Sequence, residues 1–245
     1  MSSTNNSTAA QKPRTRFQRI WDSDVFFSFR RSPVTIVAAL VTFILILAAL
    51  LAPWIAPYDP FNPASLNLMD GFTPPNSESM MGNYFVLGSD HQGRDVLSTI
   101  LYGSRISLFV GFLATLFAMA MGISLGLLAG YRGGTTDAII MRIADIQLSF
   151  PAILIALLIF GIARGIIPPS KQEGMAVWVL IVAIGLANWA QFARTVRGAT
   201  MVERQKDYVS AAKLIGVHPL RILVRHVLPN VMAPVLVIAT IGLAL

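Results

Sequence analysis

Residues 106–131 read ISLFVGFLATLFAMAMGISLGLLAGY, a stretch of apolar and small residues without one charged side chain. An α-helix rises about 1.5 Å per residue, so a run of about 20 apolar residues crosses the roughly 30 Å hydrocarbon core of a bilayer. A run of this length and composition predicts a transmembrane helix and places the chain among membrane proteins.

The composition and four further apolar runs agree with this prediction. Of the 245 residues, 55% are apolar and 13% are charged, and the mean hydropathy is +0.65, whereas a soluble domain carries about 25% charge. The further runs are residues 33–57, 139–163, 175–193 and 230–245. The last run has only sixteen residues, fewer than the roughly 17–25 that a span needs. We predict an all-α, polytopic membrane protein with four complete transmembrane helices plus a fifth that is cut short.

The basic residues indicate how these spans are oriented. Six of them precede the first run, whereas residues 58–101 hold only Arg94 against five acids. Residues 194–225 carry seven basic residues against Glu203 and Asp207. Because Lys and Arg collect on the cytoplasmic side, the pattern predicts a cytoplasmic tail over 1–32, a transmembrane helix over 33–57, an external segment over 58–105 and a core over 106–245. The first run is too long for the core of a cleaved signal peptide.

Several classes of function are disfavoured by the sequence. The net charge of +7 is distributed between apolar runs, which argues against a nucleic-acid partner. No Cys is present, so thiolate metal sites are excluded, and we expect no metal site. A phosphate-binding G-x-x-x-x-G-K-[ST] loop is also missing, so the chain has no ATP site of its own. An enzyme inside the spans would need a buried ionisable pair or an activated Ser, and no span contains one.

Small residues form a stripe along residues 106–131. They recur every four residues at Ala114, Ala118, Gly122, Gly126 and Gly130. On a helix this spacing gives one slowly drifting line along which another backbone can approach closely. The stripe indicates either packing within the chain, which we favour, or a seam between subunits.

The third run combines an ion-pair pattern with a helix breaker. Arg142 and Asp145 are three residues apart and could pair on one helix face. Pro151, after Ser149 and Phe150, predicts a kink because proline removes a backbone donor. Such a kink can line a solute path, but a structural kink is the commoner case.

Polar residues also occur in the fourth run. Asn188, Gln191 and Arg194 follow one another at intervals of three on a helix that is otherwise apolar. At membrane depth such side chains face protein or water and not lipid. They indicate either a lining of the translocation path or hydrogen bonds between helices.

Residues 200–229 predict two short helices around a turn. Gly216 is a typical helix stop, and Pro219 is suited to start the second helix. Each helix has an apolar ridge, formed by Val209, Ala212, Leu214 and Ile215 and by Leu220, Leu223, Val224 and Val227. The segment is too short for a core of its own, so it predicts docking on another protein or adsorption on the bilayer surface.

The same segment resembles the signature of ABC importer permeases. Ser210-Ala211-Ala212, three residues, Gly216, nine residues and HVLP over 226–229 match E-A-A-x3-G-x9-I-x-L-P, with Ser for Glu and His for Ile. In that family this loop is the cytoplasmic coupling helix, which inserts into a groove of the ATPase. The resemblance implies that Ser210, Ala211, Ala212, Gly216, Leu228 and Pro229 serve the coupling.

A second motif narrows the resemblance. Residues 87–98 read LGSDHQGRDVLS and residues 103–108 read GSRISL, which is similar to L-G-T-D-x-x-G-R-D-V-x-S…G-x-R-x-S-L in dipeptide, oligopeptide and nickel permeases. We interpret Asp90, Gly93, Arg94 and Asp95 as a structural elbow. Asp95 is placed to cap the helix that begins before Ser98.

The resemblance implies a permease that moves peptides or a related small solute into a cell across the bacterial inner membrane. It implies a second permease subunit, two ATPase subunits that bind ATP and Mg, and a periplasmic solute-binding protein, with lipid around the spans and no cofactor on this chain. Members of the family end with a sixth span, so we also expect a chain shortened at Leu245, unable to complete a pore alone. One alternative is a stand-alone secondary transporter or channel, but ion coupling would need charged residues at mid-membrane, and the spans contain none there. The other alternative is a membrane protein without transport activity.

Overall fold

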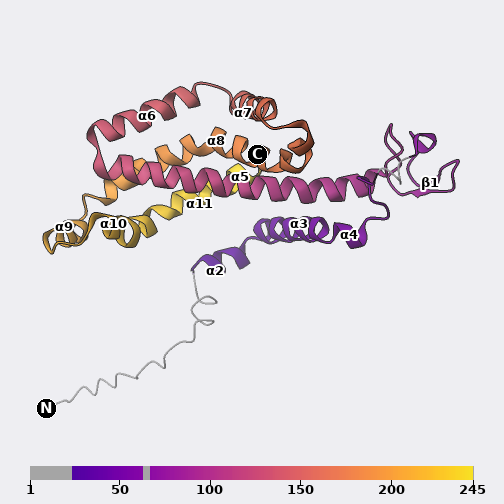
Figure 1. Cartoon of the computed structure of the whole chain (residues 1–245). Helices are drawn as coiled ribbons and strands as arrows, with labels where there is room; N and C mark the ends of the chain where they lie inside the picture. Colours follow the sequence, from indigo (N-terminus) through magenta and orange to yellow (C-terminus); the bar gives the residue numbers. More distant parts are fainter. Residues whose placement is uncertain (1–23, 63–66, 245) are drawn as a thin grey trace, which may run out of the picture. The chain divides into compact units, whose positions relative to one another are not determined.

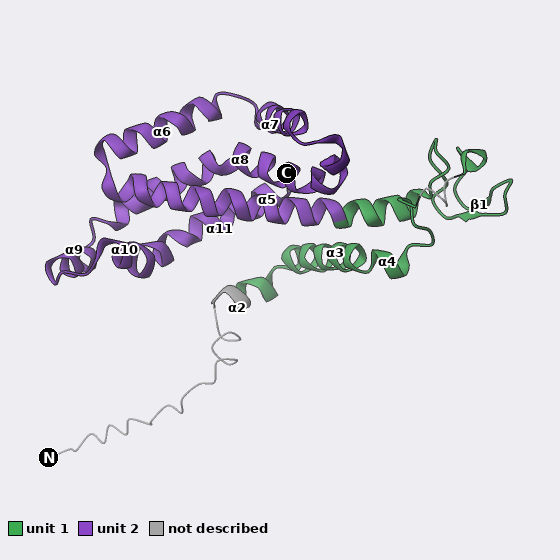
Figure 2. Cartoon of the chain, in the orientation of Figure 1, with its two compact units in different colours: residues 1–105 green, residues 106–245 purple. Residues whose placement is uncertain are grey.

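The computed structural model describes residues 24–62 and 67–244, and these are mainly helical (Figure 1). The all-α prediction is confirmed. Most of the predicted tail over 1–32 lies outside the described residues, but its last part forms α2 (Asp24–Arg31). The chain divides into two compact units, residues 1–105 and 106–245 (Figure 2).

The first unit contains one long apolar helix and a folded loop segment. Its elements are α2, α3 (Pro33–Leu50), α4 (Ala52–Ile55), the 3-10 helix η2 (Leu68–Asp70), and the antiparallel strands β1 (Ser77–Glu78) and β2 (Tyr84–Phe85). The hydroxyl of Ser32 accepts a hydrogen bond from the Thr35 amide and caps α3, which has Pro33 in its first turn. The predicted run to residue 57 is divided after Leu50, because Pro53 cannot donate to the carbonyl four residues before it.

The second unit is a bundle built on long helices. Its elements are the greater part of α5 (Val96–Arg132), α6 (Gly134–Leu148), α7 (Ala152–Ile166), α8 (Pro169–Glu203), α9 (Asp207–Leu214), α10 (Pro219–Ile222), the π-helical turn η3 (Leu223–Val227) and α11 (Leu228–Ala244). Helix α5 begins ten residues before the apolar run that predicted it, directly after the elbow residue Asp95.

The stripe of small residues on α5 is a packing surface within the chain. A Cβ atom at Gly122 would lie 2.7 Å from the Trp189 carbonyl oxygen. One at Gly126 would lie 2.6 Å from the carbonyl oxygen of Ala193. Both acceptors belong to α8, so only glycine lets the two helix backbones approach this closely.

The third apolar run forms two helices with a sharp bend between them. Helices α6 and α7 meet at an angle of 96°. Pro151 has no N–H to extend α6, and its ring disfavours the α-helical conformation of the residue before it. The chain therefore turns at Ser149 and Phe150, where the kink was predicted, and the apolar run over 139–163 is divided between the two helices.

The last helix is longer than its apolar run indicated. A helix of 26 residues extends over Pro219–Ala244 and includes the π-helical turn, in which the Leu228 amide donates to the Leu223 carbonyl. Pro229 has no N–H for the Arg225 carbonyl and would clash with it in a regular α-helix, and a π turn accommodates such a proline. The helix therefore begins at Pro219, ahead of the apolar run predicted after Pro229.

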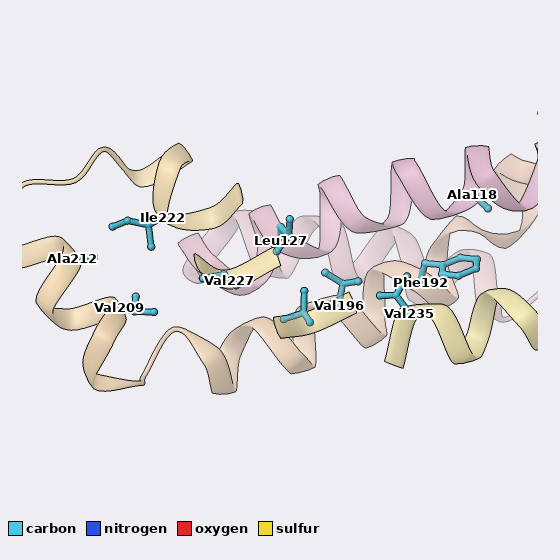
Figure 3. Close-up of a cluster of buried hydrophobic side chains, with 10 residues drawn as sticks. Ala118, Leu127, Phe192, Val196, Val209, Ala212, Ile222, Val227 and Val235 are labelled. Carbon is cyan, nitrogen blue, oxygen red and sulfur yellow. The ribbon is translucent and has the colours of Figure 1, made fainter. Parts of the chain in front are cut away.

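Four helices of the described residues are long and apolar enough to cross a membrane, namely α3, α5, α8 and the Pro219–Ala244 helix, with the bent α6–α7 pair as a fifth candidate. The main apolar core of the second unit lies where α5, α8 and the Pro219–Ala244 helix meet α9 (Figure 3). Its buried members include Leu127, Val196, Val209, Ile222 and Val227. Short helices too small to fold alone are thereby fixed to the bundle.

Candidate docking loop and polar face

The turn between α9 and α10 is closed by backbone hydrogen bonds. The Gly216 amide donates to the Lys213 carbonyl at 3.1 Å, and the Val217 amide donates to the Ala212 carbonyl at 3.0 Å. Gly216 has φ +76°, which L-residues with a side chain rarely adopt. These bonds form a Schellman motif, so Gly216 ends α9 because of its backbone conformation and not because space is short.

The apolar ridges predicted over 200–229 are divided between the inside and the outside of the bundle. Val209, Ala212 and Val227 are buried in the main core. In contrast, the exposed fractions are 87% for Leu214 and 64% for Leu220, and Ile215 and Val224 are also exposed. The inner residues hold the loop to its own chain, and the outer ones form an apolar tip. We call Leu214, Ile215, Leu220 and Val224 the loop tip.

The residues of the signature motif follow the same division. Ser210 and Ala211 are exposed on α9, whereas Ala212 is buried. Gly216 and Pro229 are exposed, and Leu228 is half-buried. The motif therefore contains both surface residues and residues that fix the loop in place.

Two basic side chains attach this loop region to the end of α5. Arg204 donates through Nη1 to the carbonyl oxygens of Gly130, at 2.8 Å, and of Tyr131, at 3.1 Å. These are carbonyls in the last turn of α5, which lack partners within the helix. The ammonium of Lys213 lies 5.2 Å from the centre of the Tyr131 ring. The sequence alone indicated only the positive charges of Arg204 and Lys213 and not these contacts.

The polar residues of α8 form an exposed face. Asn188, Gln191 and Arg194 are all exposed in this chain. Asn188 donates to the Ile184 carbonyl of its own helix at 3.0 Å, so this bond does not join two helices. Pro151, at the α6–α7 bend, is exposed as well. The arrangement leaves this face available for a partner or for water.

Helix α6 is attached to α8 by polar contacts that the sequence did not reveal. The spacing of three residues indicated a pair between Asp145 and Arg142, but Asp145 pairs instead with Arg194 of α8. The Asp137 carboxylate accepts from Arg197 Nη2 at 2.6 Å. These pairs join segments far apart in the chain, and the preference for residues three apart is too weak to outweigh them.

A partly buried group of hydrogen bonds strengthens the same α6–α8 contact. Gln147 donates through Nε2 to the Leu186 carbonyl at 2.6 Å and accepts from Trp189 Nε1 at 2.7 Å. The Ala187 carbonyl lies 2.9 Å from the same amide nitrogen. Because the amide satisfies backbone and indole groups together, Gln147 fixes the position of α6 against α8.

The elbow in the first unit is a network of capping bonds. Asp90 pairs with Arg94 at 2.7 Å, and its carboxylate accepts the Gln92 and Arg94 amides at 2.8 and 2.9 Å. Partial burial alone raises the pKa of Asp90, but the bonds from Arg94 and Gln92 outweigh it and hold the pKa below its usual value. The stabilisation is present above the ordinary pKa of an aspartate and is lost as the pH falls below it.

Asp95 and Gly93 complete this elbow. The Asp95 carboxylate accepts the Ser98 amide at 2.7 Å and caps the first turn of α5. The Ser98 hydroxyl accepts the Tyr58 amide at 3.1 Å. Gly93 has φ +75°, and a Cβ there would overlap the backbone of Asn67. The elbow thus fixes where α5 begins.

Comparison with known proteins gives two family matches. Residues 122–245 match the family described as binding-protein-dependent transport system inner membrane component. Residues 19–75 match the N-terminal transmembrane domain of oligopeptide transport permease C. The first match covers the part of the bundle that carries the loop tip and the polar face of α8.

Individual relatives agree with both matches. The dipeptide transport system permease protein DppC of Haemophilus influenzae is 35% identical over 95% of this chain and 72% of its own length. The oligopeptide transport system permease protein OppC of Bacillus subtilis is 30% identical over 96% of this chain and 71% of its own. The glutathione transport system permease protein GsiD of Pectobacterium atrosepticum is 36% identical over 91% and 67%.

Proposed function

Since the chain belongs to the family of binding-protein-dependent inner membrane transport components, we propose that it is a permease subunit of an ATP-driven importer of di- or oligopeptides or a related small solute. Its relatives are named for dipeptides, oligopeptides and glutathione. All three are short peptides or peptide-like solutes, so a peptide is the best-supported substrate class.

The loop tip is the single observation that carries this proposal. Leu214 and Leu220 expose 87% and 64% of their surface on either side of the turn at Gly216, Leu214 at the end of α9 and Leu220 in the first turn of the Pro219–Ala244 helix. Exposed apolar side chains held on a fixed loop are typical of a binding surface. We propose that the loop lies in the cytoplasm and docks on an ATPase subunit, which binds the ATP and Mg.

The remaining partners follow from the same proposal. A second permease subunit would enclose the solute path together with this chain, a second ATPase would bind that subunit, and a periplasmic solute-binding protein would deliver the solute. Asn188 and Gln191 face away from the bundle core, so they are suited to line a path between the two permeases, and Pro151 is exposed as well.

Single cysteines test the path. The natural chain has none, so Asn188→Cys and Gln191→Cys each supply a unique thiol. In the working transporter both should react with a water-soluble maleimide, and the rate should change when ATP is added. Ala190→Cys on the same helix, fully buried, serves as the matched control and should stay unlabelled. Protection of positions 188 and 191 in every state would show that they are packing contacts.

Substitution of Gly216 tests coupling to the ATPase. At φ +76° a β-branched residue is strained by about 1–3 kcal/mol, so Gly216→Val should change the turn that presents the loop tip. We expect solute-dependent ATP hydrolysis and peptide uptake to fall at least about tenfold in proteoliposomes, while membrane insertion is retained. Gly198→Val, an open site in the same unit, is the control. Normal coupled activity in the Gly216 variant would contradict docking through this turn.

Transport driven by an ion gradient is the alternative function, and uptake assays in proteoliposomes distinguish it from ATP-driven import. Uptake that follows a proton or sodium gradient without ATPase subunits would identify a secondary transporter and overturn the proposal. Uptake that requires ATP, the ATPases and the binding protein supports it.

A further inference from the structure

A polar cluster lies where the loop segment meets the bundle. The hydroxyl of Tyr208, in the first turn of α9, contacts the carboxylate of Glu203, the last residue of α8. It also lies 3.0 Å from Asn230 Nδ2 and 3.3 Å from the His226 carbonyl oxygen. One hydroxyl therefore touches residues of α8, of the π-helical turn and of α11.

The proton of this hydroxyl has one best acceptor. A phenol has a single O–H, and Glu203 offers a carboxylate at the shortest of the three contacts, so Tyr208 donates to Glu203 and accepts from Asn230. Partial burial and the bond to Glu203 raise the pKa of Tyr208 above its usual value, so the hydroxyl stays protonated at neutral pH.

Glu203 is itself a fixed group. It is only 6% exposed, and its other oxygen pairs with Lys206 Nζ at 2.7 Å. A buried carboxylate that lost one of its partners would be left partly unsatisfied. The α8 end of the cluster therefore holds Tyr208 in one place.

The α11 end of the cluster is built on the π-helical turn. Asn230 donates through Nδ2 to the His226 carbonyl at 2.9 Å as well as to Tyr208. His226 lies in the wide turn that precedes Pro229, where the regular helical pattern of bonds is interrupted. The amide of Asn230 thus holds together the turn and the tyrosine.

We propose that Tyr208 is a positioning residue that joins the docking loop rigidly to α8 and α11, so that a displacement of the loop by the ATPase moves both spans together. The proposal rests on the proposed function. Apolar side chains buried in the main core, such as Val209 and Val227, hold the loop on the bundle but set no direction. Hydrogen bonds are directional, so bonds from one hydroxyl to both helices fix the orientation of the loop relative to them.

The test compares Tyr208→Phe with Asn230→Ala in the complete transporter in liposomes. Tyr102→Phe is the matched control, because Tyr102 packs its ring on Phe61 in the other unit and lies outside the cluster. The readouts are retention of the ATPases on the complex, the rate of ATP hydrolysis and the number of peptides taken up per ATP. A purely structural role would lower retention, whereas a positioning role lowers the last ratio.

We expect both cluster variants to keep their ATPases and hydrolyse ATP while the ratio of uptake to hydrolysis falls about tenfold, as befits the loss of a bond to a charged group. Tyr102→Phe should match the unaltered chain. An unchanged ratio in both variants, or loss of the ATPases from both, would overturn the positioning role alone. Absence of ATP-driven uptake by the unaltered complex would instead overturn the proposed function, and the positioning role with it.

Discussion

A chain in which Leu214 and Leu220 are both replaced by Asp should lose its ATPase subunits and its ATP-driven uptake. The two side chains are 87% and 64% exposed, so the change removes no contact from the core of this chain. In a docked loop each would be buried against the partner, where an apolar anchor contributes about 2 kcal/mol or more. Two such losses, with two charges added, lower the affinity about a thousandfold.

Co-purification measures this effect directly. The ATPases should be absent from the complex prepared with the double variant, while the variant remains folded and inserted in the membrane. Gln205→Asp, at an exposed position between α8 and α9, adds a charge near the loop without touching the loop tip and should retain the ATPases. If the double variant keeps a full complement of ATPases, the loop tip is not the docking surface.

The spans could be predicted because they depend on a local property of the sequence. Long apolar runs must form helices in a bilayer, since backbone groups there have no water to bond. The capping of α5 by Asp95 and the stop at Gly216 are equally local, and both motifs are visible in the sequence. The small residues at Gly122 and Gly126 indicated close approach without naming α8 as the neighbour.

Features that depend on tertiary neighbours could not be predicted. Asp145 had an arginine three residues before it, but the fold offers Arg194 from a helix far along the chain. The loop ridges looked uniform, yet Val209 faces the core and Leu214 faces outward. A proline in the sequence predicts where a helix is disturbed but not by how much. At Pro151 two helices meet at an angle of 96°, whereas Pro229 is accommodated inside a helix by a π turn.

The Gly122→Ala substitution should destabilise the α5–α8 contact by about 3 kcal/mol, at the upper end of overpacking costs. The new methyl group would lie 2.7 Å from the Trp189 carbonyl oxygen and still closer to the Phe192 side chain. A backbone oxygen cannot rotate away as a flexible side chain can, so one helix must shift, and the contacts along Gly126 and Gly130 would loosen with it.

The same substitution at Gly111 separates crowding from helix propensity. There a Cβ would meet only a Leu243 methyl group at 3.6 Å, an ordinary contact, and alanine favours the helix by about 1 kcal/mol over glycine. Thermal unfolding of the purified protein in detergent should show a midpoint roughly ten degrees lower for Gly122→Ala and an unchanged or higher midpoint for Gly111→Ala. Equal midpoints for the two variants would mean that α5 and α8 can separate at Gly122 without cost, and the close helix contact would then not be what holds the bundle together.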